Sequence, residues 1–390
     1  MAAEMSASRV WPARTQYVEG IPPVLTHVTR YDIEQGRCAD CHHRVVGRDA
    51  GQVSDATGAA AAQIGPRALA LAAVLHHELG IPHAKTAKVL AQLGGLSITP
   101  DGLSQALARA ARRAQATDDA LVAGIRHSPV VAPDETGWRV NGAKKWLWVF
   151  AGQGITVYRI FDSCGYDHAE QVLGEDFSGV LERDGWAPYR KFAKASHQTC
   201  YAHLARRCRE MIADAAEGHT HIPAAVAKIL QDALVLRAAR DAGHLDPQAL
   251  AQRVVDLNER VDLLLAGEVA CCQPDRRLVK HLRNERDALF TFLALPGVAA
   301  TNWRAEQGIR PIVVNRKQWG GNRTRQGADT TQVLASLLRS ARQQHRDPVE
   351  VLTPLLTSPT PIVAGLVIPG RDPTNLITPA QPGPAPPRAA

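Results

Sequence analysis

The stretch PVVAPDETGWRVNGAKKWLWVFAGQGITVYRIF, residues 129–161, holds three apolar segments separated by short polar connections. Residues 129–134, 145–150 and 155–161 are rich in β-branched and aromatic side chains, which favour strands. Because the connections are short, we expect these strands to form an antiparallel meander. The first strand ends at a carboxylate, Asp134.

Helices and strands alternate after this meander. The patterns predict a helix at 166–174, a fourth strand at 179–184, a brief helix, a fifth strand at 196–200, helices alone at 201–292, a short helix at 303–310 and a strand-like segment at 311–314. Three strands followed by this alternation are typical of an α/β protein with an RNase H-like core.

An RNase H-like core requires carboxylates on the first strand, at the end of the fourth strand and on a later helix. Asp134 and Asp184 occupy the first two places, fifty residues apart. Two divalent ions held by such carboxylates stabilise charge on the attacking and leaving oxygens of a phosphodiester, and hard oxygen ligands select magnesium or manganese. The structural alternative is that both are turn residues, since Asp-Glu-Thr-Gly and Asp-Gly favour turns.

Residues 67–126 carry apolar side chains at helical spacing. A helix before Gly94-Gly95 is followed by a second helix, for which Thr99 is the expected N-cap and Pro100 the first helical residue. The pattern suits a helix-turn-helix DNA reader and equally an ordinary helical hairpin. For a DNA reader, the DNA-binding residues of the second helix are Arg109, Arg112 and Arg113.

The composition limits the class of protein. A chain of 390 residues with 45% apolar and 21% charged residues is an ordinary globular protein. It holds neither a run of ~18 apolar residues nor a secretory signal, so we expect a cytoplasmic, nucleoid-associated protein without a membrane partner. Its seven cysteines are odd in number and scattered, so we expect reduced thiols.

Basic residues are unevenly spread along a chain whose formal net charge is +7. Residues 304–346 hold nine Lys or Arg and two acidic residues, which suits either a polyanion partner or a solvated helix face. Within this region, two glycines in the run 316–325 let backbone approach a phosphate closely. Trp319 in the same run suits either stacking on an unpaired base or core packing.

Four segments, in order, carry a resemblance to a known family: APDETGWRVNGAKKWLWVFAG, FSGVLERDGWAPY, HQTCYAHLARR and TNWRAEQGIRPIVVNRKQWGGNRTRQGA. They resemble the IS66 family of bacterial insertion-sequence transposases, over residues 25–356. The resemblance implies a catalytic Asp-Asp-Glu triad in an RNase H-like core that a helical insertion interrupts. It also implies double-stranded DNA as partner, at terminal inverted repeats and target, a homo-oligomer, and small accessory proteins of the same element.

The family pattern places its first two carboxylates on Asp134 and Asp184. For the third, the chain offers Glu268, Glu285 and Glu306. The family's last motif resembles Asn-Asn-x-Ala-Glu-Arg followed by Arg-Pro, which fits residues 302–311 and selects Glu306. These three carboxylates are the expected ligands of Mg²⁺ or Mn²⁺.

The last motif also departs from the family. Trp303 and Gln307 stand where Asn and Arg are commoner, so local contacts to DNA are expected to differ. Phosphate contact is the expected role of the basic residues in and after the motif. They are Arg310, Arg316, Lys317, Arg323 and Arg325.

Two cysteine motifs have structural as well as functional interpretations. Cys200 and His203 follow the second Asp, where many transposases of this type carry a Cys-x-x-His pair, and they suit either a buried thiol with a helix histidine or an accessory role in positioning DNA. Cys38 and Cys41 resemble the second ligand pair of a zinc module in the family. No cysteine precedes them, and a structural zinc needs four ligands, so the missing pair argues against Zn²⁺.

These patterns predict a DDE transposase that cleaves and joins DNA strands. The alternatives are a catalytically inactive, transposase-derived DNA-binding protein and a structure-selective nuclease on the same core. The expected organisation is a partial zinc-knuckle-like segment at 1–46, a linker at 47–66, a helical DNA-binding region at 67–128, the core at 129–204 and 301–356, a helical insertion at 205–300 and a proline-rich disordered tail at 357–390.

Overall fold

The computed structural model describes residues 15–20, 26–49, 52, 64–215, 220–267 and 273–371. Most of the predicted linker, the candidate Glu268 and the end of the predicted tail lie outside these residues. No described helix combines the length with the hydropathy that a bilayer crossing demands.

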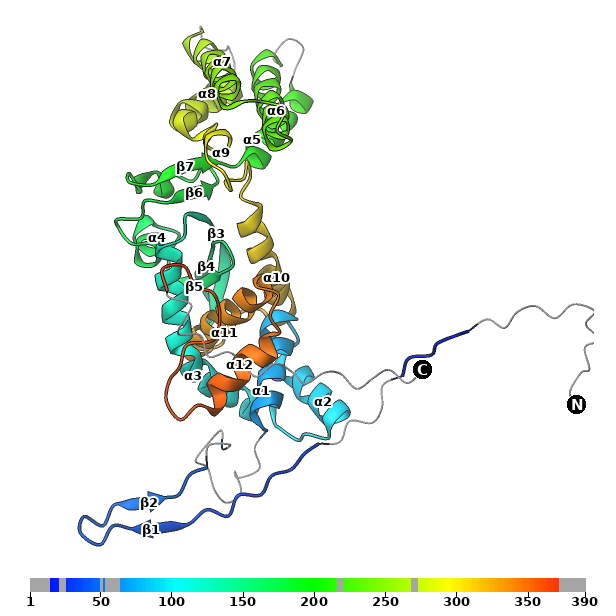
Figure 1. Ribbon diagram of the computed structural model, residues 1–390, viewed down its shortest axis with the longest axis vertical. Coiled ribbons are helices and arrows are strands. Elements are labelled where there is room, and N and C mark those ends of the chain that lie inside the picture. Colours follow the sequence, from blue (N-terminus) through cyan, green and yellow to red (C-terminus); the bar gives the residue numbers. More distant parts are fainter. Residues whose placement is uncertain are drawn as a thin grey trace, which may run out of the picture.

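A five-stranded mixed sheet lies in the middle of the molecule (Figure 1). Its strands are β3 (Val130–Val140), β4 (Ala143–Ala151), β5 (Thr156–Phe161), β6 (Val180–Arg183) and β7 (Ser196–Thr199), in the spatial order β5-β4-β3-β6-β7. β3, β4 and β5 pair antiparallel, whereas β6 and β7 continue the sheet in parallel from β3. This order is consistent with the predicted RNase H-like core.

β3 continues past the residue at which the sequence predicted its end. Asp134 pairs with Val149 of β4, and the ladder runs on to the last pair, Val140 with Ala143. The turn lies at Asn141 and Gly142, whose φ angles of 50° and 75° suit a tight hairpin with left-handed central residues. The structural alternative that made Asp134 a turn residue is therefore wrong.

Both faces of the sheet are covered, because successive residues of a strand point to opposite sides. Trp148 and Phe150 of β4 lie in a core that includes α3 (Pro100–Arg126). Leu147 and Val149 lie in a second core with residues of α10 (Trp303–Trp319). Short helices connect the later strands: α4 (Tyr166–Leu173) and a 3₁₀ helix, Ala187–Lys191.

The strand predicted at residues 311–314 is wrong, because these residues lie in helix α10. The helix continues through Pro311 and ends at Trp319. Its buried residues are Ala305, Gly308, Ile312 and Asn315, whose spacing of three or four is the helical period. The β-branched residues that suggested a strand lie in a helix because packing against the sheet overrides their weak local preference.

The helical region before the sheet comprises α1 (Pro66–Ala73), a π-helix (Val74–Glu78), α2 (His83–Gly94) and α3. Thr99 caps α3 as predicted, since its hydroxyl accepts a hydrogen bond from the backbone N–H of Gly102. α3 continues beyond Arg113 to Arg126. It runs for 27 residues, and its Leu121 and Ile125 are buried in the core of the sheet. The expected boundary at residue 128 therefore does not separate two cores.

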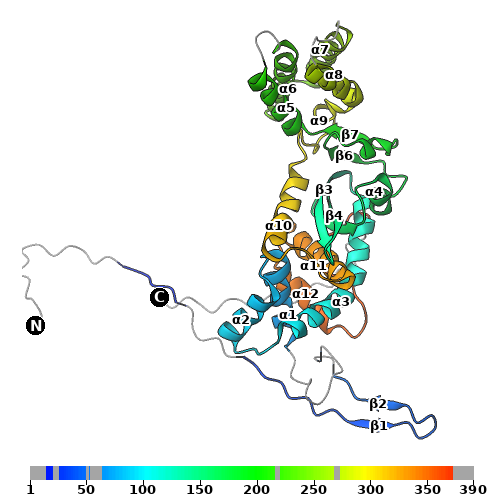
Figure 2. The same ribbon diagram turned by 180° about the vertical axis from the view of Figure 1, so that it is seen from behind.

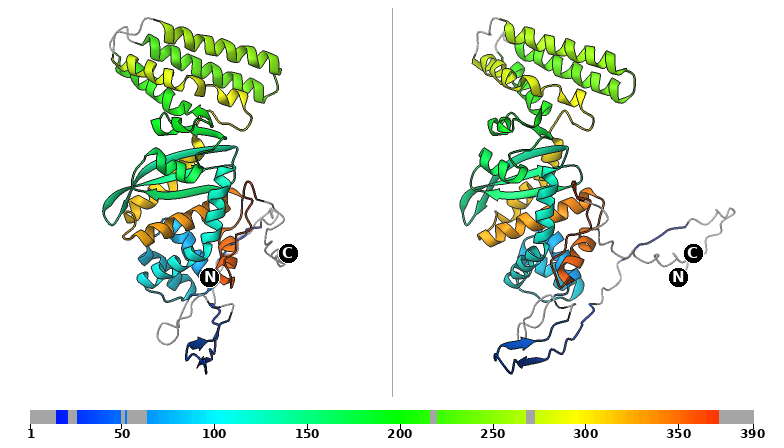
Figure 3. Two further views of the ribbon diagram at one scale, coloured as in Figure 1. Left: turned by 90° about the vertical axis from the view of Figure 1, so that its left-hand side faces the viewer. Right: turned by 60° about the vertical axis from the view of Figure 1, so that its left-hand side comes forward.

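The predicted helical insertion stands at one end of the sheet (Figures 2 and 3). Its described elements are α5 (Tyr201–Asp214), α6 (His221–Asp241), α7 (Pro247–Ala266), α8 (Gln273–Glu285), a 3₁₀ helix (Arg286–Ala288) and α9 (Thr291–Ala294). They contribute most of a separate apolar core, which reaches the sheet at Val130 and Val180.

α11 (Arg325–Gln343) and α12 (Pro348–Thr357) complete the helical layers. The disordered tail predicted from residue 357 is wrong for residues 358–371, because Leu366 and Ile368 are buried in the main core. Gly124 of α3 makes room for this segment, since a Cβ there would lie 2.5 Å from Ile368. Near the other end, β1 (Gln35–Arg37) and β2 (Arg44–Val46) form a two-stranded hairpin away from the sheet (Figure 1).

Candidate active site

The sheet brings Asp134 and Asp184 to one region. β3 and β6 pair in parallel with Val130 opposite Val180, an offset of fifty residues that also separates the two carboxylates. Asp184 directly follows the last residue of β6, and its carboxylate accepts a 2.9 Å hydrogen bond from the backbone N–H of Trp186. Both aspartates are half-buried.

Glu306 reaches the same region from the first turn of α10. A glycine two residues later, Gly308, lets this helix lie against the sheet, because a Cβ there would lie only 3.0 Å from Val149. The hydroxyl of Tyr158 in β5 donates a 2.6 Å hydrogen bond to the Gly308 carbonyl and fixes the helix on that face. The Glu306 side chain itself is exposed.

The electrostatics of Asp134 show that the three carboxylates are neighbours. Burial, the largest effect, and the negative charges of Asp184 and Glu306 raise the pKa of Asp134, whereas the backbone N–H of Glu135 and the positive charge of His203 lower it; together they bring the pKa to about 6. Among the described residues, no Lys or Arg forms an ion pair with any of the three. Oxygen ligands that repel one another without a fixed counter-charge fit a divalent cation.

Glu135 and Tyr189 add a second acidic feature beside this site. The Tyr189 hydroxyl donates a 2.6 Å hydrogen bond to the Glu135 carboxylate. Burial raises the pKa of Glu135 to about 7, and the charges of Asp184 and Asp134 act in the same direction. Neither residue is among those that the sequence predicts to be functional.

A buried ion pair joins the elements that carry Asp184 and Glu306. Glu182 of β6 is fully buried and accepts two 2.8 Å hydrogen bonds from Arg304 of α10, together with one from the backbone N–H of Ala299. Each member lies two residues before one of the carboxylates, so the pair fixes the end of β6 relative to the start of α10.

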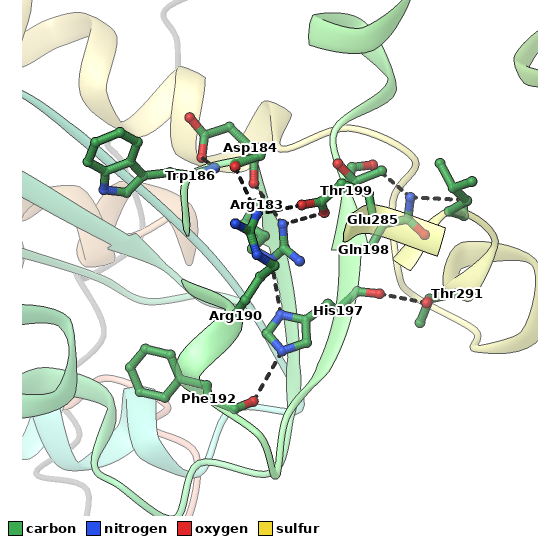
Figure 4. A network of polar contacts seen from close by, with 12 residues as sticks. Arg183, Asp184, Trp186, Arg190, Phe192, His197, Gln198, Thr199, Glu285 and Thr291 are labelled. Carbon is green, nitrogen blue, oxygen red and sulfur yellow. Dashed lines mark hydrogen bonds and ion pairs between the residues drawn. The ribbon is translucent and has the colours of Figure 1, made fainter. Parts of the chain in front are cut away.

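A second buried network ties Asp184 to the helical insertion (Figure 4). Arg183 donates hydrogen bonds to the backbone carbonyl of Asp184 at 3.0 Å and to Glu285 of α8 at 2.6 Å. Arg190 donates to the other oxygen of Glu285 at 2.9 Å, and the Arg183 Nε donates to the ring of His197. Glu285, one of the three candidates for the third carboxylate, is thus already paired with two guanidinium groups.

The side chains of Cys200 and His203 lie close to the side chain of Glu306. Their sulfur and ring nitrogen and a Glu306 carboxylate oxygen all lie within 4.8 Å of one another, the one such set of three or more potential ligands among the described residues. Asp134 and Asp184 do not belong to it. The Cys200 thiol is buried at the N-cap of α5, as the structural interpretation predicted.

The predicted DNA-binding arginines divide into exposed and internally bound groups. Arg113 donates to the carbonyl of Ser358, Arg316 donates to Thr136 and to the carbonyl of Gly137, and Arg325 pairs with Asp329 at 3.0 Å. Arg109 is half-buried. The exposed residues are Arg112, Arg310, Lys317, Arg323 and Arg325, the last of which is exposed although it pairs with Asp329.

The glycine pair after α10 serves packing rather than leaving open backbone. Gly320 ends α10 with φ of 79°, and a Cβ on Gly321 would lie 2.5 Å from the carbonyl oxygen of Arg139. This close approach lets Asn322 exchange backbone hydrogen bonds with the β3–β4 hairpin. Trp319 contacts the rings of His76 and Trp138, which is the core interpretation of that tryptophan.

Cys38 and Cys41 lie at the turn of the β1–β2 hairpin. Backbone N–H groups of Cys41 and Asp40 lower the pKa of the Cys38 thiol. Neither cysteine belongs to a set of three potential metal ligands within the described residues.

Comparison with known proteins identifies the group to which this arrangement belongs. Residues 61–330, more than two thirds of the chain, match the family described as "Transposase IS66 family". The chain belongs to the IS66 family. Members of this family are DDE transposases, a catalytic class that binds DNA and typically uses divalent metal ions.

One curated relative of the IS66 chain is "Uncharacterized protein y4qI" of Sinorhizobium fredii. The two are 24% identical over 319 residues, which cover 75% of this chain. The aligned region spans 59% of the length of that relative.

Sequence reasoning missed the buried charges that hold the site together. Glu182 and Arg183 stand beside Val180 and Leu181 in a strand that is buried throughout. Charged side chains in such a strand need partners, because buried charges are rarely left unpaired. That signal was available, but their partners, Arg304 and Glu285, could be found only from the fold.

Proposed function

We propose that this chain is a DNA transposase in which Asp134, Asp184 and Glu306 hold two magnesium or manganese ions. The supporting observation is the convergence of three carboxylates, from β3, the end of β6 and α10, none of which is paired with a Lys or Arg among the described residues. When bound, the metal ions supply charge stabilisation to the attacking and leaving oxygens of a phosphodiester.

The residues of the chain have separate tasks in this reaction. The three carboxylates would hold the ions, which would supply charge stabilisation at the scissile phosphate. Water attacks the phosphorus and releases a 3′-hydroxyl, which then attacks a phosphate of the target DNA without a covalent enzyme intermediate. Arg112, Arg310, Lys317 and Arg323 are exposed and free to contact phosphates of the terminal repeats and target.

The paired charges keep the carboxylates in place. The ion pair between Glu182 and Arg304 fixes the position of the end of β6 relative to α10. The ion pair between Arg183 and Glu285 fixes the position of Asp184 relative to the helical insertion. We further propose that the active form is a homo-oligomer, since two element ends must be joined, and that small accessory proteins of the same element assist it.

The test is cleavage of labelled DNA that carries the element's own ends, with magnesium or with a chelator. Nicking at the ends that depends on magnesium and is lost in Asp184→Asn supports the proposal. Asp162→Asn is the matched control, because Asp162 is an exposed carboxylate that pairs with Lys145. Binding to the ends without nicking, unchanged by Asp184→Asn and by added accessory proteins, would favour the alternative of a catalytically inactive DNA-binding protein.

A further inference from the structure

Cys200, His203 and Glu306 form a ligand set whose chemistry differs from that of the three carboxylates. A thiol sulfur, an imidazole nitrogen and a carboxylate oxygen lie within 4.8 Å of one another. Cys200 caps α5, His203 lies in the first turn of that helix, and Glu306 comes from α10. The set therefore depends on the packing of two elements about a hundred residues apart in the chain.

We propose that this trio binds a zinc-class divalent ion, and that the bound ion holds Glu306 away from Asp134 and Asp184. The inhibitory half of this inference rests on the proposed role of Glu306 in cleavage. The binding half rests on the ligand set alone and can be tested without DNA.

The donor types decide which ion the trio prefers. Thiolate and imidazole are ligands for zinc and similar transition metals, whereas magnesium takes oxygen ligands and keeps much of its water. Three protein ligands with a fourth position left for water are a common arrangement for zinc. The trio thus discriminates against magnesium, although it shares Glu306 with the proposed magnesium site.

Burial raises the pKa of the Cys200 thiol, and the backbone N–H groups around its sulfur act in the opposite direction. Its sulfur accepts backbone hydrogen bonds from Ala202 and His203 at the start of α5 and a 3.4 Å bond from the backbone N–H of Asn302. Amide donors and a helix N-terminus both stabilise negative charge on sulfur. They would support the thiolate that forms when an ion displaces the thiol proton.

Unpaired buried polar atoms of His203, a member of the trio, and of Asn302, next to Cys200, point to a ligand. The Nδ1 atom of His203 is buried without a hydrogen-bond partner. Asn302 is 1% exposed, and neither polar atom of its side chain has a partner, although its backbone N–H bonds to the Cys200 sulfur. Unpaired buried polar atoms cost free energy, which an ion and its bound water would recover at this place.

Glu306 cannot serve both sites at the same time. When the carboxylate binds an ion with Cys200 and His203, the proposed magnesium site has only Asp134 and Asp184. Because the sulfur and nitrogen donors favour the zinc-class ion, zinc at far lower concentration than magnesium would suppress DNA cleavage. The site would couple strand cleavage to the supply of thiophilic metal.

The binding test uses cobalt as a spectroscopic substitute for zinc. The full chain with Cys38→Ser and Cys41→Ser is titrated with Co²⁺, and thiolate-to-cobalt absorption is followed. We expect the thiolate-to-cobalt absorption to saturate at one ion per chain, and we expect Cys200→Ser to remove the absorption and weaken binding at this site by at least about 100-fold. Cys208→Ser, which alters another buried thiol of α5, and Asp134→Asn should leave it unchanged. Unchanged absorption in Cys200→Ser would overturn the proposal.

A second variant guards against misfolding. If Cys200→Ser changes the circular dichroism of the protein, His203→Gln replaces it, and retained cobalt affinity in that variant also overturns the proposal. The cleavage assay compares the double variant Cys38→Ser, Cys41→Ser with a triple variant that also carries Cys200→Ser. Zinc should inhibit magnesium-dependent nicking by the double variant and not by the triple variant. Equal inhibition of both would refute the inhibitory role. A chain that binds cobalt through Cys200 but never nicks DNA would contradict the proposed transposase function and leave the metal site supported.

Discussion

Glu285 and Glu306 are two candidates for the third catalytic carboxylate. Replacing each of them with Gln should affect stability and cleavage in different ways. We expect Glu285→Gln to lower stability strongly and Glu306→Gln to abolish cleavage with little change in stability. The expectation follows from their surroundings: Glu285 is fully buried between Arg183 and Arg190, whereas Glu306 is exposed and has no ion-pair partner among the described residues.

The size of the stability effect follows from burial. Arg183 is 2% exposed, so loss of the Glu285 charge leaves a guanidinium in the interior with only a carbonyl and an imidazole beside it. Breaking one partner of a buried ion pair costs about 3–5 kcal/mol. For a chain of this size we expect the melting temperature to fall by roughly 6–20 °C. Glu306→Gln, a surface change, should stay within about 0.5 kcal/mol.

The assays are urea or thermal unfolding at pH 7 and magnesium-dependent nicking at a temperature where both variants are folded. Glu306→Gln should reduce nicking by about a thousandfold or more, since several kcal/mol of charge stabilisation depend on the metal. Glu285→Gln should retain measurable nicking. A loss of stability below about 1 kcal/mol for Glu285→Gln, or above about 2 kcal/mol for Glu306→Gln, would refute the assignment of the two roles.

Three further predictions test the electrostatics, the corrected C-terminal boundary and the DNA surface. Since burial is the main cause that raises the pKa of Asp134 from 3.8 to about 6, nicking should rise through about pH 6 as the carboxylate loses its proton, and a flat pH–rate profile would contradict this. Asp134→Asn should stabilise the protein by up to about 3 kcal/mol above pH 6, and this gain should disappear as the pH falls towards 3.8. Leu366→Ala should cost about 2–5 kcal/mol in urea unfolding, whereas a loose tail would show no loss. Arg323→Ala should weaken DNA binding and lower the salt dependence by about one charge, while Arg316→Ala should lower stability instead, and the reverse outcome in filter binding and unfolding would reject the division between exposed and internal arginines.

The strands, and the positions of Asp134 and Asp184 on or next to them, could be predicted because their signals are local. β-branched and aromatic runs between short turns define β3 to β5, and the Thr99-Pro100 pair fixes the start of α3 through one nearby hydrogen bond. The choice of Glu306 came from a motif resemblance, and it agrees with the packing of α10 on the sheet beside Asp134.

Predictions failed where a local pattern met a stronger tertiary contact. The segment 311–314 has the composition of a strand, but α10 buries one side chain in every three or four against the sheet and remains helical through Pro311. Arg113 and Arg316 appeared in sequence as free cations, but each donates to a backbone carbonyl of a distant segment. The order of charged residues in the sequence does not show which of them form internal hydrogen bonds in the folded protein.

The sequence by itself determined the order of the elements, the fifty-residue offset between Asp134 and Asp184, and membership in a transposase family, because these depend on short-range periodicity and on motifs read in order. Only the tertiary structure decided how the site is held. Glu182 meets Arg304 across 122 residues, and Arg183 meets Glu285 across 102. Such partners are chosen by the cost of leaving a charge unpaired in the interior, and that cost exists only once the chain has folded around it.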